Sequence, residues 1–232
     1  MRVELERALT GIGLPCSQPT LEIFCRYYEI LISWNRRVNL TALCTPEDFI
    51  YKHVCDSLLP AIIFPQAMSS LVDVGTGAGF PGLPIKIALS GVKLTLVEAA
   101  AKKVAFLQYC CRELGVEAEI VGKRAETLGQ GEGRGAFAGA ITRAVSGLTV
   151  VSEYCLPLLA VGGCLLALRG PQGEKEAQAA KKAFGQLGGR LLQVHPYRLP
   201  TGDPRCLVVV EKFRPTPAAY PRRPGIPAKR PL

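Results

Sequence analysis

The chain has 232 residues, 48% of them apolar, which is enough to bury one substantial core and excludes a disordered protein. No stretch reaches the roughly 18 apolar residues that a membrane-spanning helix needs, since the longest candidate, 156–168, is interrupted by one proline and two glycines. The formal net charge of +9 favours a polyanionic partner, although charge alone does not distinguish RNA, DNA and an acidic membrane surface.

The cysteines and the first residues indicate the compartment. Nine cysteines are scattered through apolar surroundings with no C-x-x-C pair and no clustered histidines, a pattern typical of reduced core thiols. Charged residues fill the first turns, including Arg2, Glu4 and Glu6, where a signal peptide would begin its apolar segment. We therefore expect a cytoplasmic protein without a metal site or a membrane anchor.

Residues 1–65 predict a helical extension. Apolar residues within 21–32 recur at three- and four-residue steps, which gives one stripe for packing. A capping threonine, a proline and two acids at 45–48 begin a further helix, on which His53 and Asp56 fall close together. Such a pair more often makes a structural hydrogen bond than a catalytic dyad, and no serine in a nucleophile elbow accompanies it.

A glycine-rich loop follows the first predicted strand, 71–74. Glycines recur at every second position from Gly75 to Gly79, where positive φ angles and the absence of a Cβ allow a ligand to approach the backbone closely. Pro81 suits the first turn of a following helix. This strand, loop and helix are typical of the nucleotide-binding end of an α/β sheet.

Two ligand classes are compatible with this loop. Gly77, Gly79 and Gly82 formally satisfy G-x-G-x-x-G, and Glu98 follows where a dinucleotide fold has its ribose-binding acid. However, Asp73 lies inside the strand, where its carboxylate would order the loop and attract an ammonium group but repel a pyrophosphate. We therefore favour S-adenosylmethionine over a dinucleotide.

From residue 71 onwards strands and helices alternate, which predicts a mainly parallel sheet covered on both faces. The further strands are expected at 93–98, 118–121, 138–142, 164–168, 190–194 and 206–211, and helices at 99–115, 148–160 and 174–187. The last two strands are too close for a helical crossover and should form an antiparallel hairpin. The expected fold class is α/β: a class I (Rossmann-like) S-adenosylmethionine-dependent methyltransferase sheet, mostly parallel with an antiparallel edge hairpin, plus N-terminal helices.

The chain should therefore comprise the N-terminal helical extension 1–65, a methyltransferase core 66–213 and a basic proline-rich C-terminal tail 214–232. The tail holds six prolines, five Arg or Lys residues and no acid. We expect it to be an extended basic arm rather than a core element. Such an arm could solubilise the protein or, with Tyr220 among its charges, contact RNA.

Taken in order, the motifs resemble one family, the bacterial small-subunit ribosomal RNA methyltransferase G, also called glucose-inhibited division protein B. The resemblance extends from about Trp34 to the C-terminus and rests on these motifs: V-N-L-T at 38–41, H-x-x-D-S at 53–57, D-V-G-T-G-A-G-F-P-G-L-P at 73–84, L-V-E-A followed by K-K-V-x-F-L, R-A-E at 124–126, T-R-A-V at 142–145, and the final Y-P-R-R-P-G-I-P-A-K-R-P-L. The resemblance implies methyl transfer from S-adenosylmethionine to N7 of one guanine in the decoding region of 16S ribosomal RNA.

The resemblance also implies roles for individual residues. Gly75 and Phe80 would line the methionine end of the cofactor, Glu98 would bind the ribose, and 125–126 would contact the adenine. The expected cofactor-binding residues are Asp73, Gly75, Gly77, Gly79, Phe80, Glu98, Ala125, Glu126 and Arg143.

Arginines are the expected catalytic residues. Guanine N7 carries an unprotonated lone pair, so catalysis needs positioning rather than a general base. A guanidinium can donate to guanine O6 while remaining charged, and we select Arg143 first, then Arg124 and Arg169. The alternative is that these arginines simply pair with Glu98 or Glu126. Many family members have lysine at the position of Arg169. In this chain a guanidinium therefore stands where those members have a compact ammonium.

Two other function classes stay open at this point. A nicotinamide-dependent dehydrogenase would bind NAD and no S-adenosylmethionine, and a non-catalytic ribosome-binding factor would bind RNA without transferring a methyl group. The expected partner is 16S ribosomal RNA or the small ribosomal subunit, bound by a monomer, and the sequence does not distinguish free RNA from the assembled subunit.

Overall fold

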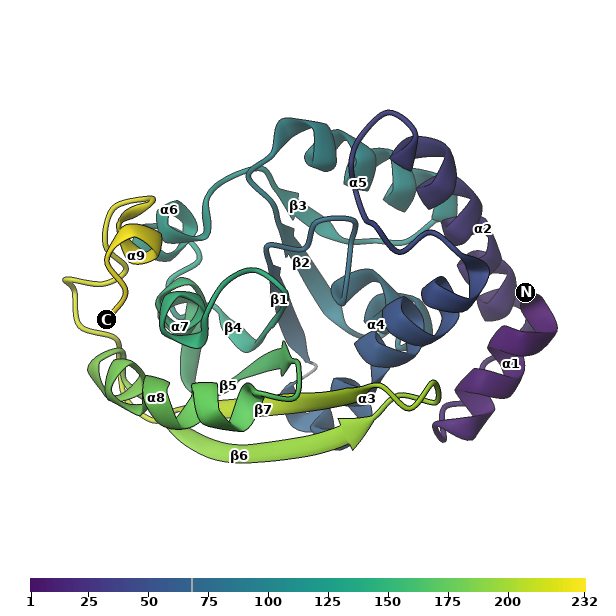
Figure 1. Ribbon diagram of the computed structural model, residues 1–232. Helices are drawn as coiled ribbons and strands as arrows, with labels where there is room; N and C mark the ends of the chain where they lie inside the picture. Colours follow the sequence, from purple (N-terminus) through teal and green to yellow (C-terminus); the bar gives the residue numbers. More distant parts are fainter. Residues whose placement is uncertain (68) are drawn as a thin grey trace.

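The computed structural model describes residues 1–67 and 69–232; Met68, within the expected core 66–213, lies outside them. A seven-stranded sheet organises the chain, in the order β3-β2-β1-β4-β5-β7-β6 (Figure 1). Its strands are β1 Ser70–Val74, β2 Lys93–Val97, β3 Glu119–Val121, β4 Phe137–Arg143, β5 Leu159–Arg169, β6 Gly189–Arg198 and β7 Pro204–Lys212.

The sheet has the predicted topology. Strands β3, β2, β1, β4 and β5 pair in parallel, so their carboxyl ends share one edge. β7 pairs antiparallel with both β5 and β6, which confirms the edge hairpin. The strand order reverses between β1 and β4, the place where open α/β sheets bind their ligands.

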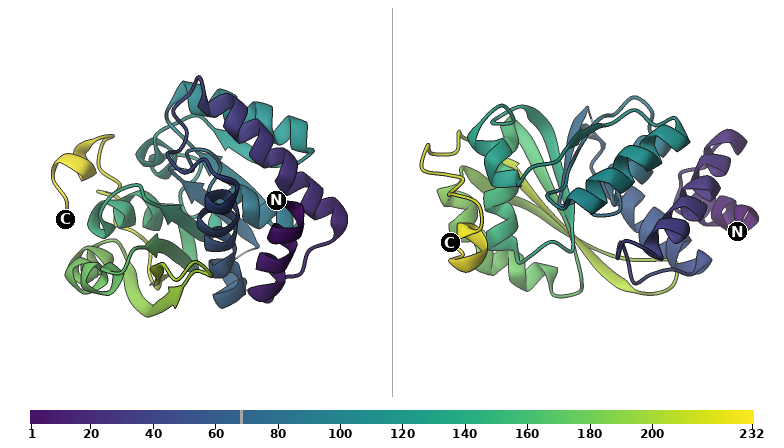
Figure 2. Two further views of the ribbon diagram at one scale, coloured as in Figure 1. Left: turned by 45° about the vertical axis from the view of Figure 1, so that its right-hand side comes forward. Right: turned by 90° about the horizontal axis from the view of Figure 1, so that it is seen from above.

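Helices cover both faces of the sheet (Figure 2). The α-helices are α1 Arg2–Gly11, α2 Gln18–Asn35, α3 Asp56–Ile63, α4 Gly82–Ala88, α5 Ala101–Leu114, α6 Ala125–Gln130, α7 Leu148–Cys155, α8 Gly173–Gln186 and α9 Ile226–Lys229. A π-helix, Asp48–Cys55, runs directly into α3, and short 3-10 helices lie at Pro65–Ala67 and Leu156–Leu158. Helices α1–α5 pack on one face and α6–α8 on the other.

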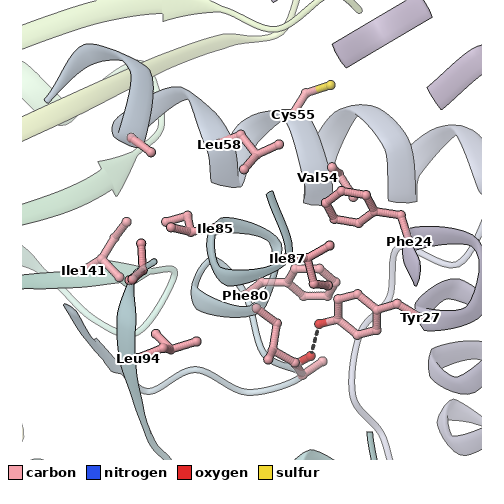
Figure 3. Packing of buried hydrophobic residues seen from close by; sticks show 14 of the residues in the cluster. Phe24, Tyr27, Val54, Cys55, Leu58, Phe80, Ile85, Ile87, Leu94 and Ile141 are labelled. Carbon is pink, nitrogen blue, oxygen red and sulfur yellow. Dashed lines mark hydrogen bonds between the residues drawn. The ribbon is translucent and has the colours of Figure 1, made fainter. Parts of the chain in front are cut away.

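Alternation along the strands creates two apolar cores. Leu71 joins the core beneath α1–α5, whereas Val72 joins the core beneath α6–α8, and Leu207 and Val208 of β7 divide in the same way. Figure 3 shows side chains of the first core, where residues from the N-terminal helices pack with residues of the sheet. The N-terminal helices therefore share their apolar core with the sheet.

The helix expected over 148–160 ends earlier, at Cys155. Pro157 lies in the 3-10 helix that follows, and β5 already begins at Leu159, which pairs with Phe137. The second half of this apolar run therefore forms the start of the buried strand β5 and does not continue the helix. In the part of the chain that the structure describes, no helix is long and apolar enough to cross a membrane.

The C-terminal tail also differs from expectation, because it is folded rather than extended. Residues 214–232 lie against α6 and α7 and include the short helix α9 (Figure 1). Pro221 and Pro227 are buried, and Leu232 packs on the core beneath α6–α8. Residues elsewhere in the chain form hydrogen bonds with several of the tail's backbone groups, which the composition of the tail does not indicate.

Candidate active site

A cavity of about 710 Å³ opens at the carboxyl ends of β1, β4 and β5. Several of the residues selected from the sequence line it together: Gly75, Gly77, Phe80, Arg143 and Arg169. Further charged or polar residues line it as well: Lys52, His53, Asp56, Lys103, Glu176 and Arg205. The cavity therefore joins the glycine loop to a group of cations.

The glycine loop has the expected conformation. Gly75 and Gly77 have φ angles of +71° and +62°, a region that favours glycine. A Cβ on Gly75 would lie 2.6 Å from Cγ2 of Val145, so the loop also needs the missing side chain for packing. Gly79, with φ +95°, faces Tyr27 and the interior rather than the cavity, which assigns it to packing in this structure.

Asp73 orders this loop from below. Its Oδ2 accepts hydrogen bonds from Thr76 Oγ1 at 2.6 Å and from the Gly82 N–H at 2.8 Å. Oδ1 has no hydrogen-bond donor among the described residues. Burial raises the pKa of this carboxyl to about 6, opposed by the hydrogen bonds from Thr76 and Gly82. The structure thus buries Asp73 behind the loop instead of in the cavity lining.

Glu98 follows β2 and holds the other side of the loop. Its Oε2 accepts a hydrogen bond from the Gly77 N–H at 3.1 Å, and Oε1 accepts one from the Ala100 N–H at 2.8 Å. This carboxylate is only partly buried, and it lies beside the glycine loop but outside the residues that line the cavity. The sequence prediction that acids flank the glycine loop on two strands agrees with this geometry.

Arg143, at the end of β4, is fixed by three acceptors. Nη1 donates to the Lys52 carbonyl at 2.7 Å and to Asp56 Oδ2 at 3.2 Å, while Nη2 lies 2.9 Å from His53 Nδ1. The guanidinium carbon also stands 5.2 Å from the centre of the Phe80 ring. These contacts attach the strand end to the π-helix and α3.

The Arg143 contact fixes the tautomer of His53. Because a guanidinium only donates, His53 Nδ1 must accept, and Nε2 then carries the proton toward Thr41 Oγ1, 3.2 Å away. The imidazole stacks on Phe80, with ring centres 4.1 Å apart. Burial, with the nearby Arg143 charge as the second cause, lowers the pKa of His53 to about 3. His53 is therefore neutral at physiological pH and holds Arg143 and Phe80 in place.

Asp56 connects the site to the edge hairpin, a link that the sequence reading missed. Its Oδ1 accepts a hydrogen bond from the Tyr197 hydroxyl at 2.8 Å and lies 3.8 Å from Arg205 Nε. Burial, with Asp56 as the second cause, raises the pKa of Tyr197. Tyr197 and Arg205 are direct cross-strand partners in β6 and β7, a register that the sequence does not reveal.

Arg169, at the end of β5, is held by α8. Its Nε donates to Glu176 Oε2 at 3.1 Å, Nη2 donates to the same oxygen, and Nη1 donates to the Ser146 carbonyl at 2.7 Å. The expected alternative partners for the arginines, Glu98 and Glu126, are thus not the ones used here. Lysine could not make these contacts in one plane, which explains how the guanidinium fits this position.

The remaining selected residues lie away from the cavity lining. Arg124 is exposed at the N-terminus of α6 and makes no ion pair with any residue that the structure describes. Ala125 and Glu126 are buried in the first turn of α6, and Glu126 Oε1 accepts a hydrogen bond from the Gly225 N–H at 2.9 Å. The structure therefore separates Arg124 from Arg143 and engages Glu126 with the C-terminal tail.

Comparison with known proteins gives a family match. A family model described as rRNA small subunit methyltransferase G matches residues 20–201. A protein from Pelotomaculum thermopropionicum named ribosomal RNA small subunit methyltransferase G is 45% identical over 225 residues, covering 95% of this chain and 94% of that protein. A protein of the same name from Deinococcus radiodurans is 45% identical over 234 residues, covering 98% of this chain and 91% of that protein.

Solved structures share the fold at low sequence identity. TYW2 of M. jannaschii, solved in complex with AdoMet, has a TM-score of 0.56 at 12% identity and covers 69% of this chain and 76% of its own. The putative transferase PH0793 of Pyrococcus horikoshii has a TM-score of 0.54 at 13% identity, covering 68% of this chain and 64% of its own. These likenesses show a common fold.

Proposed function

The chain belongs to the rRNA small subunit methyltransferase G family, and we propose that it transfers a methyl group from S-adenosylmethionine to N7 of a guanine in the decoding region of 16S ribosomal RNA. The single observation that carries this proposal is the continuity between the glycine loop and the arginines in one cavity. One part of this cavity suits a small donor and the other suits an anionic, base-bearing acceptor.

The residues of the loop fit the donor. Gly75 and Gly77 put no Cβ between the backbone and the cavity, and Phe80 supplies an apolar wall. Buried Asp73 holds the loop in shape from behind, while the partly buried carboxylate of Glu98, beside Gly77, suits the hydroxyl groups of such a ligand. The cavity volume of about 710 Å³ lies in the range of roughly 300–1,000 Å³ that is typical of small-molecule sites.

The charges of the cavity suit RNA. Lys52, Lys103, Arg143, Arg169 and Arg205 line it, against the two acids of α3 and α8, which are already bonded to the arginines. A cleft lined mainly by one sign of charge raises the local concentration of a polyanion. A splayed guanine with its phosphates is an acceptor of that kind.

The arginines retain donors for such a base. A guanidinium carries five N–H donors. Arg143 directs three of them at Lys52, Asp56 and His53, so that one Nη2 hydrogen and the Nε hydrogen remain without an acceptor among the described residues. Because the three internal contacts fix the guanidinium plane, the remaining donors have a fixed direction, as recognition of guanine O6 requires.

Chemistry at N7 needs little from the protein besides this positioning. When bound, S-adenosylmethionine supplies an electrophilic methyl group on a sulfonium. The lone pair of N7 is free at neutral pH, so no side chain has to remove a proton before attack. Neutral His53, whose Nδ1 accepts from Arg143, is accordingly a positioning residue here and not a general base.

The test is methylation of small subunits that lack this modification. Labelled donor and protein are incubated with the subunits, and N7-methylguanine is mapped by borohydride and aniline cleavage. We expect one modified guanine with wild type and strongly reduced label with Arg143→Ala. Arg190→Ala is the matched control, because Arg190 is exposed on β6, where it forms an ion pair with Glu211 of the next strand and lies over the Phe213 ring. Absence of label with wild type, or label at another atom, would contradict the proposal.

Family membership sets the two alternatives aside. The matching family model and the relatives are methyltransferases, which does not fit a nicotinamide-dependent dehydrogenase. An intact glycine loop joined to the arginine cavity also argues against a binding factor without activity. We further propose a cytoplasmic, monomeric enzyme, since its ribosomal RNA substrate is assembled in the cytoplasm and a single chain contains the whole cavity.

A further inference from the structure

The folded C-terminal tail forms a fixed cationic surface, and we propose that this surface binds the phosphate backbone of the substrate RNA next to the active site. We call Arg223, Lys229 and Arg230 the tail cations. This inference rests on the proposed function and adds a second RNA contact, outside the cavity.

One carboxylate anchors the middle of the tail. Glu153, on α7, is completely buried and accepts hydrogen bonds from the Arg222 backbone N–H at 2.8 Å, from Arg222 Nε and from Nη2 at 2.6 Å. A buried carboxylate with several donors holds its partner strongly, because breaking the pair leaves an uncompensated charge. Arg222 is therefore a structural residue and not part of the free charge.

A second set of contacts anchors the part of the tail that precedes Arg222. Arg134 donates to the carbonyls of Thr216 at 2.6 Å and Tyr220 at 2.7 Å, and Gln130 donates to the carbonyl of Pro221 at 2.9 Å. These carbonyls belong to a proline-rich segment that has no regular backbone pairing of its own. The tail therefore has a defined path from residue 216 to α9.

The tail cations face solvent. Arg223, Lys229 and Arg230 are exposed and form no ion pair with the residues that the structure describes. Residues 214–232 include no acidic side chain, and the acids of α6 and α7 beneath them, Glu126 and Glu153, are buried and already bonded to the tail. The surface is thus cationic without a neutralising neighbour in the tail, a pattern suited to phosphates.

The tail cations lie toward the edge of the sheet that carries the active site. Gly225, between Arg223 and Lys229, is held by Glu126 in the first turn of α6. That helix begins after the carboxyl end of β3, the edge at which β1 and β4 present the glycine loop and Arg143. Exposed Arg124 at the start of α6 extends the positive charge toward that edge. An RNA whose guanine enters the cavity could therefore continue over α6 onto the tail.

The structure also restricts how the tail contacts RNA. Tyr220 is only partly exposed and packs on the core beneath α6–α8, so it is not a free ring for stacking between bases. The remaining chemistry is that of ammonium and guanidinium groups with phosphate, which binds without sequence preference. Because the backbone that carries these cations is already anchored, RNA binding orders less of the chain than it would with a mobile arm.

A charge-matched pair of double variants tests this inference in the full-length protein. The tail pair is Arg223→Gln with Lys229→Gln. The control pair is Arg112→Gln with Lys93→Gln, which removes the same two charge types at exposed sites, on the last turn of α5 and at the amino end of β2. Binding to protein-free small-subunit rRNA is measured by fluorescence anisotropy across a salt series, and donor binding is measured by calorimetry.

We expect the tail pair to raise the Kd for RNA relative to the control pair. Each lost phosphate contact should lower the magnitude of the slope of log K against log salt by about 0.7–0.9, so two contacts lower it by roughly 1.5. The Kd for S-adenosylmethionine and the melting temperature should stay at the wild-type values, because these side chains are exposed and distant from the glycine loop.

Three results would overturn the inference. The first is an equal Kd and salt slope for the tail and control pairs. The second is an unchanged Kd of the tail pair for protein-free rRNA together with a raised Kd for complete small subunits, which would indicate that the tail contacts a ribosomal protein instead. The third is a loss of donor binding in the tail pair. If wild type itself neither binds RNA nor transfers a methyl group, the proposed function fails; if wild type does both while the two pairs behave alike, only the tail inference fails.

Discussion

Replacing Arg143 by alanine tests the central feature of the site, which is a guanidinium fixed by internal acceptors. The variant removes donors from the Lys52 carbonyl, Asp56 and His53 Nδ1. Removing one partner of a buried ion pair costs about 3–5 kcal/mol. Asp56 keeps the Tyr197 hydroxyl and Arg205, so we expect the lower end, about 3 kcal/mol of unfolding free energy.

Catalysis should fall independently of this loss of stability. If the free donors of Arg143 position the base, their removal should slow single-turnover methyl transfer by at least about 100-fold, which corresponds to roughly 2.7 kcal/mol in the activation free energy. The assay is single-turnover transfer to undermethylated subunits, run where urea titration shows the variant to be folded. Arg143→Lys keeps the charge but not the planar fork, and we expect it to recover only a small part of the rate.

A third measurement checks that the internal network has been broken. Burial is the main cause of the low pKa of His53, and the Arg143 charge is the second cause. In Arg143→Ala the pKa of His53, followed by NMR, should therefore rise above 3 but stay below the ordinary value of 6.5. A folded Arg143→Ala variant that transfers methyl groups within about threefold of wild type would refute the positioning argument.

Three further predictions concern the loop and the tail. Gly75→Ala should weaken donor binding in calorimetry by about tenfold or more, because the φ of Gly75 is +71° and the new Cβ would meet a neighbouring side chain. The control Gly135→Ala, at φ +66° with open space around it, should lower the unfolding free energy by only roughly 1–2 kcal/mol. Because the pKa of Asp73 is raised to about 6, the folded state binds the carboxyl proton of Asp73 more tightly than the unfolded state does. The unfolding free energy should therefore fall by up to about 3 kcal/mol as pH rises from about 4 through about 6. Urea titrations of Asp73→Asn should lack this decline. Arg222→Ala should lower the unfolding free energy by about 3 kcal/mol since it leaves Glu153 buried without its ion partner, and Glu153→Gln, which keeps a neutral acceptor, should cost less in the same titration.

Those parts of the fold that depend on local pattern could be predicted from the sequence. Alternating apolar residues and glycine loops identified the strands, and the rule that parallel strands share one carboxyl edge brought Gly75, Arg143 and Arg169 to one cavity. The glycine spacing alone did not separate Gly79, which packs against Tyr27, from the glycines that face the cavity.

Long-range register and tail packing could not be predicted in this way. Arg205 reaches Asp56 only because β7 pairs with β6 in one particular register, which includes an irregularity between Leu191 and Gln193. A hairpin slipped by one residue would turn Arg205 away, and composition is the same in both registers. The expectation of an extended tail was wrong for a similar reason, since Glu153, which anchors Arg222 of the tail, lies 69 residues earlier in the chain.

The basic residues of this chain divide into two groups that should affect different kinetic constants. Arg143 and Arg169 have most of their donors fixed by internal acceptors, so they can orient a base and should act on the rate at saturating RNA. Arg223 and Lys229 are exposed and have no internal acceptor among the described residues, so they can attract phosphate but orient nothing, and they should act on the KM for RNA and its salt dependence. A tail variant that lowered the rate at saturating RNA, with its KM unchanged, would contradict this division, because a screened exposed charge has no means of orienting the reacting guanine.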